Sequence, residues 1–234
     1  GLNLDWFVAN DAERTGLFHD RAISRSLGVS ALVASCVTIL AVSLATLNAF
    51  LFDRYRFPGK NLLFILMLLP LVIPGVILGI SILIFASRIA NYFDFNHDIL
   101  LEMLRPGLLL VVLGQFAFLS TIATLVISAR FRTFDVQLEE AARNLGASQL
   151  TAIVTVTLPF LAPAIIGSAL ICFLMSFENF NTTLMLVGSD APLTITLFSR
   201  LREGAIPVLN AVSLMLMLGS MGVALIAVRV QKRA

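Results

Sequence analysis

The stretch EEAARNLGAS, residues 139–148, is a polar segment that lies between long apolar runs. Asp135 stands just before it, in the position of an N-cap that begins a helix, and Gly146 stands where a left-handed residue ends one. Ser148 is a second N-cap, and we expect the helix that follows it to end near Pro159, since proline interrupts helical hydrogen bonding. The stretch therefore predicts two short helices joined by a glycine.

Composition places this stretch in an integral membrane protein. Of the 234 residues, 59% are hydrophobic and 13% are charged, and the mean hydropathy is +0.96. Soluble domains average about 25% charged residues. The net charge is only +2 and no long basic block is present, so the chain lacks the charge pattern of a nucleic-acid-binding protein.

Five apolar runs are long enough to span a bilayer, which requires about 20 residues. They cover residues 27–52, 62–86, 108–128, 164–187 and 208–228. Their length and their lack of strand alternation predict helices, so we expect an all-α membrane protein. Within the second run, Gly75 and Gly79 form a GxxxG pair suited to close helix packing, while Pro70 and Pro74 favour a kink.

The charges of the loops indicate the orientation. The loops fall into two sets, residues 53–60, 129–159 and 229–234 on one side, and residues 1–26, 87–107 and 188–207 on the other. The first set holds nine Lys and Arg against four acids, and the second holds seven against nine. The positive-inside rule therefore predicts that the first set and the C-terminus are cytoplasmic. We expect residues 1–26 to form an external N-terminal segment and residues 27–234 to form the transmembrane domain.

The helix predicted after Asp135 has a small apolar face with an acidic flank. Glu139 and Glu140 fall near its N-terminal turns, where the helix dipole favours negative charge. The apolar face is formed by Leu138, Ala141, Ala142 and Leu145. Such a face suits insertion into a groove on a partner protein. The alternative is an interfacial helix that rests on lipid or on its own bundle.

The spacing within this loop resembles the EAA loop of bacterial ABC importer permeases. Glu140-Ala141-Ala142 is followed after three residues by Gly146 and, after nine more, by VTLP, where the family pattern has Ile in place of Val156. More of the chain resembles the second permease subunit of spermidine/putrescine-type importers. The similar segments are YRFPGK (55–60), FDVQLEEAARNLGAS (134–148), LPFLAPAIIGSALICFLMSFENFNTTLMLVGS (158–189) and REGAIPVLNAVS (202–213).

The resemblance implies a type I ABC importer permease bundle of six helices, of which five are visible here and the first is expected upstream. It implies a coupling surface for an ATPase that is formed by Glu139, Glu140, Ala141, Ala142, Leu145, Gly146 and Pro159. ATP and Mg would be used by that ATPase, because this chain has no GxxxxGK[ST] phosphate loop, and we expect no cofactor, metal or enzymatic activity in it. The implied partners are a second homologous permease, two ATPase copies, an external substrate-binding protein and the lipid of a bacterial inner membrane.

The segment SFENFNTTL, residues 176–184, places a carboxylate inside the fourth apolar run. An ionised acid at membrane depth costs roughly a few kcal/mol, so Glu178 must pair, protonate or face water. We expect a substrate path in which Glu178 meets a cation, which is a polyamine if the resemblance extends to the substrate, and aromatic rings stack on it. The candidate path residues are Phe177, Glu178, Asn179, Phe180, Asn181 and Asn210. The alternative is a structural contact between Glu178 and a neighbouring helix.

Two other functions stay open at this point. An ion-gradient-driven secondary transporter or channel would use Glu178 as its cation or proton site, although the chain has no detectable inverted repeat. A non-transporting scaffold would use the surface helix to recruit a soluble protein. Cys36 and Cys172 lie in apolar runs without metal-ligand spacing, and we predict that both are buried packing residues.

Overall fold

The computed structural model describes residues 10–11, 14–15, 19–97, 99–204 and 207–232. The elements described are helical apart from two short paired strands, β1 (Asn10–Asp11) and β2 (Arg14–Thr15). The α-helices are α2 (Arg21–Arg54), α3 (Lys60–Val72), α4 (Gly75–His97), α5 (Leu108–Phe131), α6 (Val136–Asn144), α7 (Gln149–Ala152), α8 (Leu158–Phe177), α9 (Asn181–Leu186), α10 (Leu193–Glu203) and α11 (Pro207–Lys232). A 3₁₀ turn (Glu102–Leu104) precedes α5, and a π-helical segment (Ile153–Thr157) joins α7 to α8.

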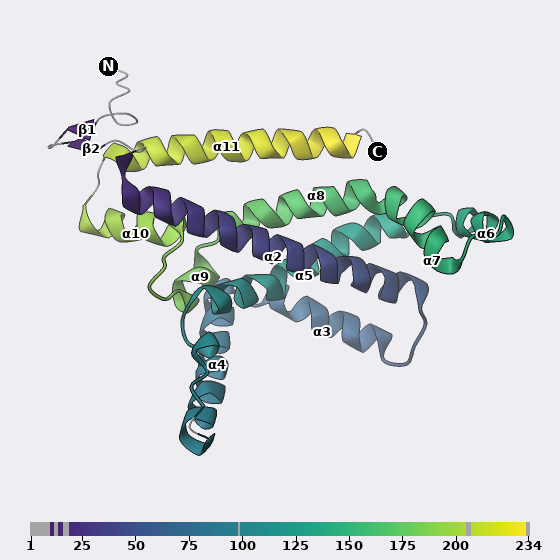
Figure 1. Ribbon diagram of the computed structural model, residues 1–234, viewed down its shortest axis with the longest axis horizontal. Coiled ribbons are helices and arrows are strands. Elements are labelled where there is room, and N and C mark those ends of the chain that lie inside the picture. The colour runs from purple at the N-terminus through teal and green to yellow at the C-terminus, as the bar shows by residue number, and fades with distance from the viewer. Residues whose placement is uncertain (1–9, 12–13, 16–18, 98, 205–206, 233–234) are drawn as a thin grey trace.

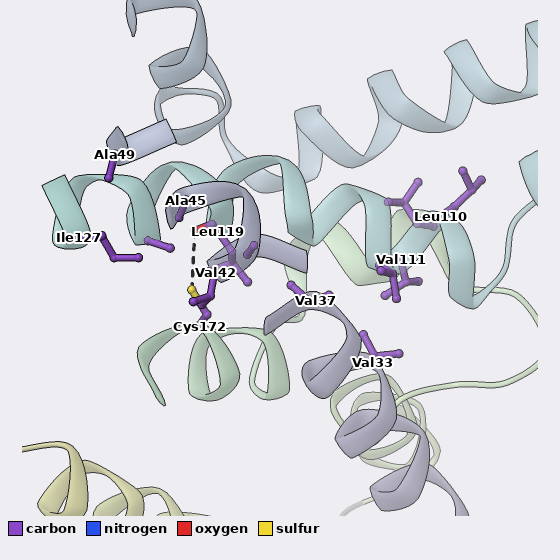
Figure 2. Close-up of a cluster of buried hydrophobic side chains, with 14 of the residues drawn as sticks. Val33, Val37, Val42, Ala45, Ala49, Leu110, Val111, Leu119, Ile127 and Cys172 are labelled. Carbon is purple, nitrogen blue, oxygen red and sulfur yellow. Dashed lines mark hydrogen bonds between the residues drawn. The ribbon is translucent and has the colours of Figure 1, made fainter. Parts of the chain in front are cut away.

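The core of the bundle lies between α2, α5 and α8, which run along the long axis of the molecule (Figure 1). Ala41 and Ala45 of α2 and Ala123 of α5 are fully buried, and such small residues allow helix backbones to approach closely. Figure 2 shows Cys172 of α8 in this cluster, where its Sγ donates to the carbonyl of Leu119 at 3.7 Å. The packing prediction is therefore confirmed for Cys172. It is wrong for Cys36, which is exposed on α2.

The first spanning helix begins before its apolar run. The Asp20 carboxylate accepts hydrogen bonds from the backbone N–H groups of Ala22 and Ile23 at 3.0 and 3.1 Å, so it caps α2 and the helix starts at Arg21. Most of the predicted external segment, residues 1–26, lies outside the described residues. Its last six residues belong to α2.

The second apolar run, expected as one span, is two helices. Ile73 has extended backbone, with ψ of 129°, because the ring of Pro74 disfavours helical geometry in the residue before it. The run therefore divides into α3, with 13 residues, and α4, with 23. Figure 1 shows α4 pointing away from the long axis that α2, α5, α8 and α11 follow.

Four helical segments of the described chain are long and apolar enough to cross a membrane: Arg21–Arg54, Gly75–His97, Leu108–Phe131 and Gln149–Phe177. The fifth run lies in α11. The short helices α6 and α7 lie at one end of the bundle and α10 lies at the opposite end (Figure 1). The loop 129–159, which holds α6 and α7, and the predicted external loop 188–207, which holds α10, are thus separated along the long axis of the molecule.

Candidate functional site

The two helices of the loop 129–159 begin where the sequence predicts. Asp135 caps α6 by accepting the backbone N–H of Gln137 at 2.9 Å. Ser148 caps α7 by accepting the backbone N–H of Thr151 at 3.1 Å. Both N-cap predictions are therefore confirmed.

Gly146 ends α6 in the left-handed conformation predicted for it, with φ of +95°. Its N–H donates to the carbonyl of Arg143 at 2.9 Å, and the N–H of Ala147 donates to the carbonyl of Ala142 at 3.1 Å. This pair of bonds is the Schellman motif, in which the two residues after a helix satisfy carbonyls of its last turn. The glycine fixes the angle at which the chain leaves α6.

The predicted apolar face of α6 is open. No residue of this helix is buried, and the exposed fractions of Leu138 and Leu145 are 52% and 90%. Ala141 is exposed as well, and Ala142 is half-buried. Exposed leucines beside alanines on a short surface helix are typical of a surface that another protein covers.

Glu140, the first residue of the EAA motif, and Glu139, which precedes it, face different surroundings. Glu140 is exposed and lines an open polar pocket of about 540 Å³ together with Arg143 and Ser148. Glu139 turns toward the bundle, and its side chain is only 12% exposed. Its carboxylate contacts Arg54 at the end of α2 and Thr157 at the end of the π-helical segment.

Pro159 does not end a helix, and the expectation that it does is wrong. The segment Gln149–Phe177 is continuous, with Pro159 in the first turn of α8. The five residues Ile153–Thr157 before it are π-helical. A π-turn shifts the hydrogen-bond register of a helix, so the missing N–H of a proline just after it disrupts less than it does in a regular helix interior.

The predicted polar patch in the fourth run is a break between two helices. Helix α8 ends at Phe177, Glu178 is its C-cap, and α9 begins only at Asn181. The run is thus not one span. Broken helices expose backbone polar groups at membrane depth, and proteins tolerate this where the break is packed in protein or lines a cavity.

A chain of hydrogen bonds from α5 holds this break. The hydroxyl of Ser176 donates to Oε1 of Gln115, and Nε2 of Gln115 donates to the hydroxyl of Thr183 at 2.9 Å. The hydroxyl of Thr183 in turn donates to Oδ1 of Asn179 at 3.0 Å. Sequence analysis missed Gln115, although it is the only amide side chain in the run 108–128. Asn179 of the candidate path belongs to this network.

Glu178 itself is exposed at the break and contacts α11. Its Oε1 accepts the hydroxyl proton of Ser220 at 2.6 Å. This contact agrees with the structural alternative, yet it uses one acceptor site of a carboxylate that has about four. The exposed side chain of Glu178 therefore keeps acceptor sites beyond this one contact.

An aromatic pocket of about 370 Å³ lies next to this break. It is lined by Phe180, Leu197, Phe198, Leu201, Asn210 and Ser213, from the break, α10 and α11. The rings of Phe180 and Phe198 lie in tilted contact, with an interplanar angle of 59° and centroids 4.9 Å apart. The structure therefore brings two of the predicted path residues, Phe180 and Asn210, to one cavity.

The last two candidates lie away from this cavity. Phe177 stacks on Phe173 with ring centroids 5.9 Å apart and packs on the cluster of Ile23 and Val212. Asn181 is exposed at the start of α9 and lies against Gly75 of α4, where a Cβ would be 3.2 Å from its own. Phe177 thus packs against neighbouring side chains, and Asn181 lies where α4 meets α9.

Three glycines let α4 and α5 approach α9. A Cβ on Gly79 would lie 3.0 Å from both the Cβ of Met185 and the carbonyl oxygen of Thr182. A Cβ on Gly75 or Gly114 would lie 3.1 Å from a side-chain atom of Thr182. The GxxxG prediction of close packing is therefore confirmed, with α9 as the partner.

An ion pair joins α10 to the start of α2. Arg200 donates to both carboxylate oxygens of Asp20, one of them at 3.0 Å. Burial raises the pKa of Asp20, but hydrogen bonds from Arg200 and from the backbone of Ile23 outweigh it, so its pKa lies below the ordinary value of 3.8. The ion pair fixes α10 at this end of the bundle.

Comparison with known proteins identifies the architecture. Residues 38–234 match the family described as "Binding-protein-dependent transport system inner membrane component". The chain is 34% identical over 209 residues to the putrescine transport system permease protein PotI of Escherichia coli K12, covering 88% of this chain and 72% of that protein. It is 25% identical to the spermidine/putrescine transport system permease protein PotC of Haemophilus influenzae, covering 97% and 83%.

A solved structure shares the fold. A bacterial ABC transporter involved in import of the acidic polysaccharide alginate superposes with a TM-score of 0.76 at 17% identity, covering 93% of this chain and 81% of that chain. The family match and the relatives give no support to the ion-gradient alternative. The chain therefore belongs to the family of inner-membrane components of binding-protein-dependent transport systems, as a non-enzymatic permease subunit of an ABC importer.

Proposed function

We propose that this chain forms half of a path by which a polyamine such as putrescine or spermidine crosses the inner membrane. The observation that carries the proposal is the exposed carboxylate of Glu178 at the break between α8 and α9. A carboxylate at this depth is costly unless water or a cation reaches it. The names of the relatives, a putrescine and a spermidine/putrescine permease, support a cationic amine as the ligand.

The surroundings of Glu178 suit an alkyl diamine. The pocket around Phe180 and Phe198 supplies aromatic faces for methylene groups and for an ammonium ion. Asn210 supplies an amide oxygen in the same pocket. An amine that passes from this pocket toward Glu178 would replace its contacts with water by contacts with these aromatic faces and this amide oxygen.

We propose that α6 is the docking helix for an ATPase subunit. The open face of Leu138, Ala141 and Leu145 would enter a groove on the ATPase, and Glu140 would lie at the rim. A second permease and two ATPase copies would complete the complex in the membrane. An external binding protein would deliver the substrate.

The orientation that we propose follows from the loop charges and the placement of the ends. The end with α6 and α7 would be cytoplasmic, because Arg54, Arg56 and Lys60 crowd the short connection from α2 to α3 there. The opposite end, with α10, would face outward and receive the binding protein. Helix α11 runs toward the α6 end, so the C-terminus would be cytoplasmic (Figure 1).

The first experiment measures ATP hydrolysis by the complete complex in lipid, with its binding protein. Putrescine, spermidine, a neutral solute and an anion are added one at a time. We expect stimulation by the polyamines alone. Stimulation by the neutral solute or by the anion would refute both the polyamine proposal and the cation role of Glu178.

The second experiment replaces Glu178 by Gln. A hydrogen bond to a charged group contributes about 1.5–3 kcal/mol, and each 1.4 kcal/mol is tenfold, so polyamine transport should fall by about tenfold or more. The matched control is Glu102→Gln, at an exposed acid outside the apolar runs, which should transport at the wild-type rate. Equal rates for both variants at matched expression would refute an electrostatic role of Glu178.

A further inference from the structure

We propose that Arg54, Glu139 and Thr157 form a joint, the Glu139 junction, that transmits the movement of α6 to the spanning helices. This inference rests on the proposed docking of an ATPase on α6. The three are positioning residues, because none of them faces the candidate path. The junction connects the coupling helix to the two helices α2 and α8 through a single carboxylate.

Both oxygens of Glu139 are engaged. Oε2 lies 2.5 Å from Nη2 of Arg54 and forms an ion pair with it. Oε1 accepts the hydroxyl proton of Thr157 at 2.8 Å. Arg54 is the last residue of α2, and Thr157 is the last residue of the π-helical segment before α8. One side chain of α6 therefore holds the ends of two spanning helices.

Arg54 is also held from α5. Its guanidinium carbon lies 5.3 Å from the ring centroid of Phe131 and 5.4 Å from that of Phe134. Both rings are buried, and Phe131 is the last residue of α5. A cation that contacts two buried rings and a half-buried carboxylate has little freedom to move independently of them.

The rest of α6 is loosely attached. No residue of this helix is buried, and its leucines face outward. A force applied to that open face must reach the bundle through the few places where α6 is tied down. The Glu139 junction is such a place, and it ties α6 to helices other than its sequence neighbour α7.

The position of Thr157 gives the junction a route to the path. Thr157 is fully buried, and α8 begins at the next residue and ends at Phe177, directly before Glu178. The π-helical segment differs in register from the helices on either side, and such segments occur frequently at functional sites. Displacement of Glu139 would therefore act on α8 at this segment.

The test uses Glu139→Gln in the complete complex in lipid, and it measures three quantities. These are co-purification of the ATPase subunit, the ATP hydrolysis rate, and putrescine transported per ATP. We expect co-purification and hydrolysis within about twofold of wild type, because the docking face is unchanged, and transport per ATP lower by about tenfold, the change that the loss of one charge-assisted contact implies. The matched control is Arg132→Gln, which removes the exposed Arg132 side chain from its ion pair with Asp53 at the same end of the bundle and should keep the wild-type ratio.

A double-mutant cycle separates a joint from independent stabilising contacts. If Arg54 and Glu139 act as one unit, Arg54→Gln and the double variant should lower transport per ATP no further than Glu139→Gln alone. Thr157→Val removes the hydrogen bond that joins Glu139 to the segment before α8, with little change in side-chain shape. It should also lower the amount of putrescine transported per ATP. Additive losses across the cycle would overturn the inference, and so would a wild-type ratio in Glu139→Gln.

A second readout needs no substrate. The variant Asn210→Cys, in a Cys36→Ser background, reports by maleimide labelling whether ATP changes access to the pocket. We expect an ATP-dependent change with native Glu139 and none with Glu139→Gln. An ATP-dependent change in both proteins would overturn the Glu139 junction alone. No change with native Glu139 would refute the proposed docking of the ATPase on α6, and the junction with it.

Discussion

Replacement of Gly146 by Ala tests how far the coupling helix depends on one backbone conformation. Nothing lies within 4 Å of a Cβ at this position, so the substitution causes no clash. The penalty comes from φ of +95°, a left-handed conformation that costs an L-residue about 1–2 kcal/mol. That energy corresponds to a shift of about 5–30-fold between the native turn and a rearranged one that loses the two Schellman bonds.

The assay is titration of the ATPase subunit against the permease in detergent, with bound ATPase as the signal. We expect Gly146→Ala to weaken the apparent affinity by about 5–30-fold. Gly146→Asn should weaken it less, because asparagine tolerates the left-handed region. Gly28→Ala is the control, since Gly28 lies within α2 with open space around it.

Two outcomes would refute this reasoning. Equal affinities for Gly146→Ala and Gly28→Ala would mean that the left-handed turn does not position the docking face. A greater loss in Gly146→Asn than in Gly146→Ala would mean that side-chain size, and not backbone conformation, is limiting.

Two further predictions concern stability. Gly79→Val should destabilise the protein by about 1–3 kcal/mol, because its Cβ would meet Met185 and backbone at 3.0 Å; a thermal midpoint in detergent equal to that of Gly28→Ala would contradict the close packing. Asp20→Asn should cost about 1–3 kcal/mol at pH 7, because asparagine can still cap α2 but loses the charge paired with Arg200. Since the pKa of Asp20 is lowered in the fold, this stabilisation is complete above pH 3.8 and is lost as the pH falls below that value. The midpoints of wild type and Asp20→Asn should therefore converge in acid, and a constant difference would show that charge is not the cause.

Local chemistry made the coupling loop predictable from sequence. Asp135, Gly146 and Ser148 act on backbone groups within five residues of themselves, so their spacing alone predicts the helix ends. Pro159 was misread because its effect depends on the π-helical register of the five residues before it. Helix propensities of single residues do not reveal that hydrogen-bond register.

The breaks in the second and fourth runs were not predicted, because hydropathy measures how apolar a segment is and not whether it is continuous. Pro74 in the second run and Glu178 in the fourth run stand out in the sequence as residues unusual for an apolar helix. Whether such a residue kinks a helix or ends it depends on what satisfies the freed backbone groups. In the fourth run part of that support comes from Gln115, which is more than 60 residues away in the chain.

The orientation of the Glu139 side chain toward the bundle was also not predicted, again because it depends on residues distant in the sequence. Its partner Arg54 lies 85 residues earlier, at the end of another helix. Sequence spacing identified the acidic start of α6 correctly, but both glutamates looked equivalent. Only the tertiary contacts distinguish the one that faces the bundle from the one that faces outward.

The shortness of α9 has a consequence for the order in which the protein folds. Helices of fewer than about 12 residues are marginal on their own, and α9 has six. Its helical state therefore depends on the surfaces that Gly79 of α4 and Gly114 of α5 provide. We therefore expect α9 to become helical only where it packs on α4 and α5, so the region that includes Glu178 should be among the last parts of the chain to reach its native structure.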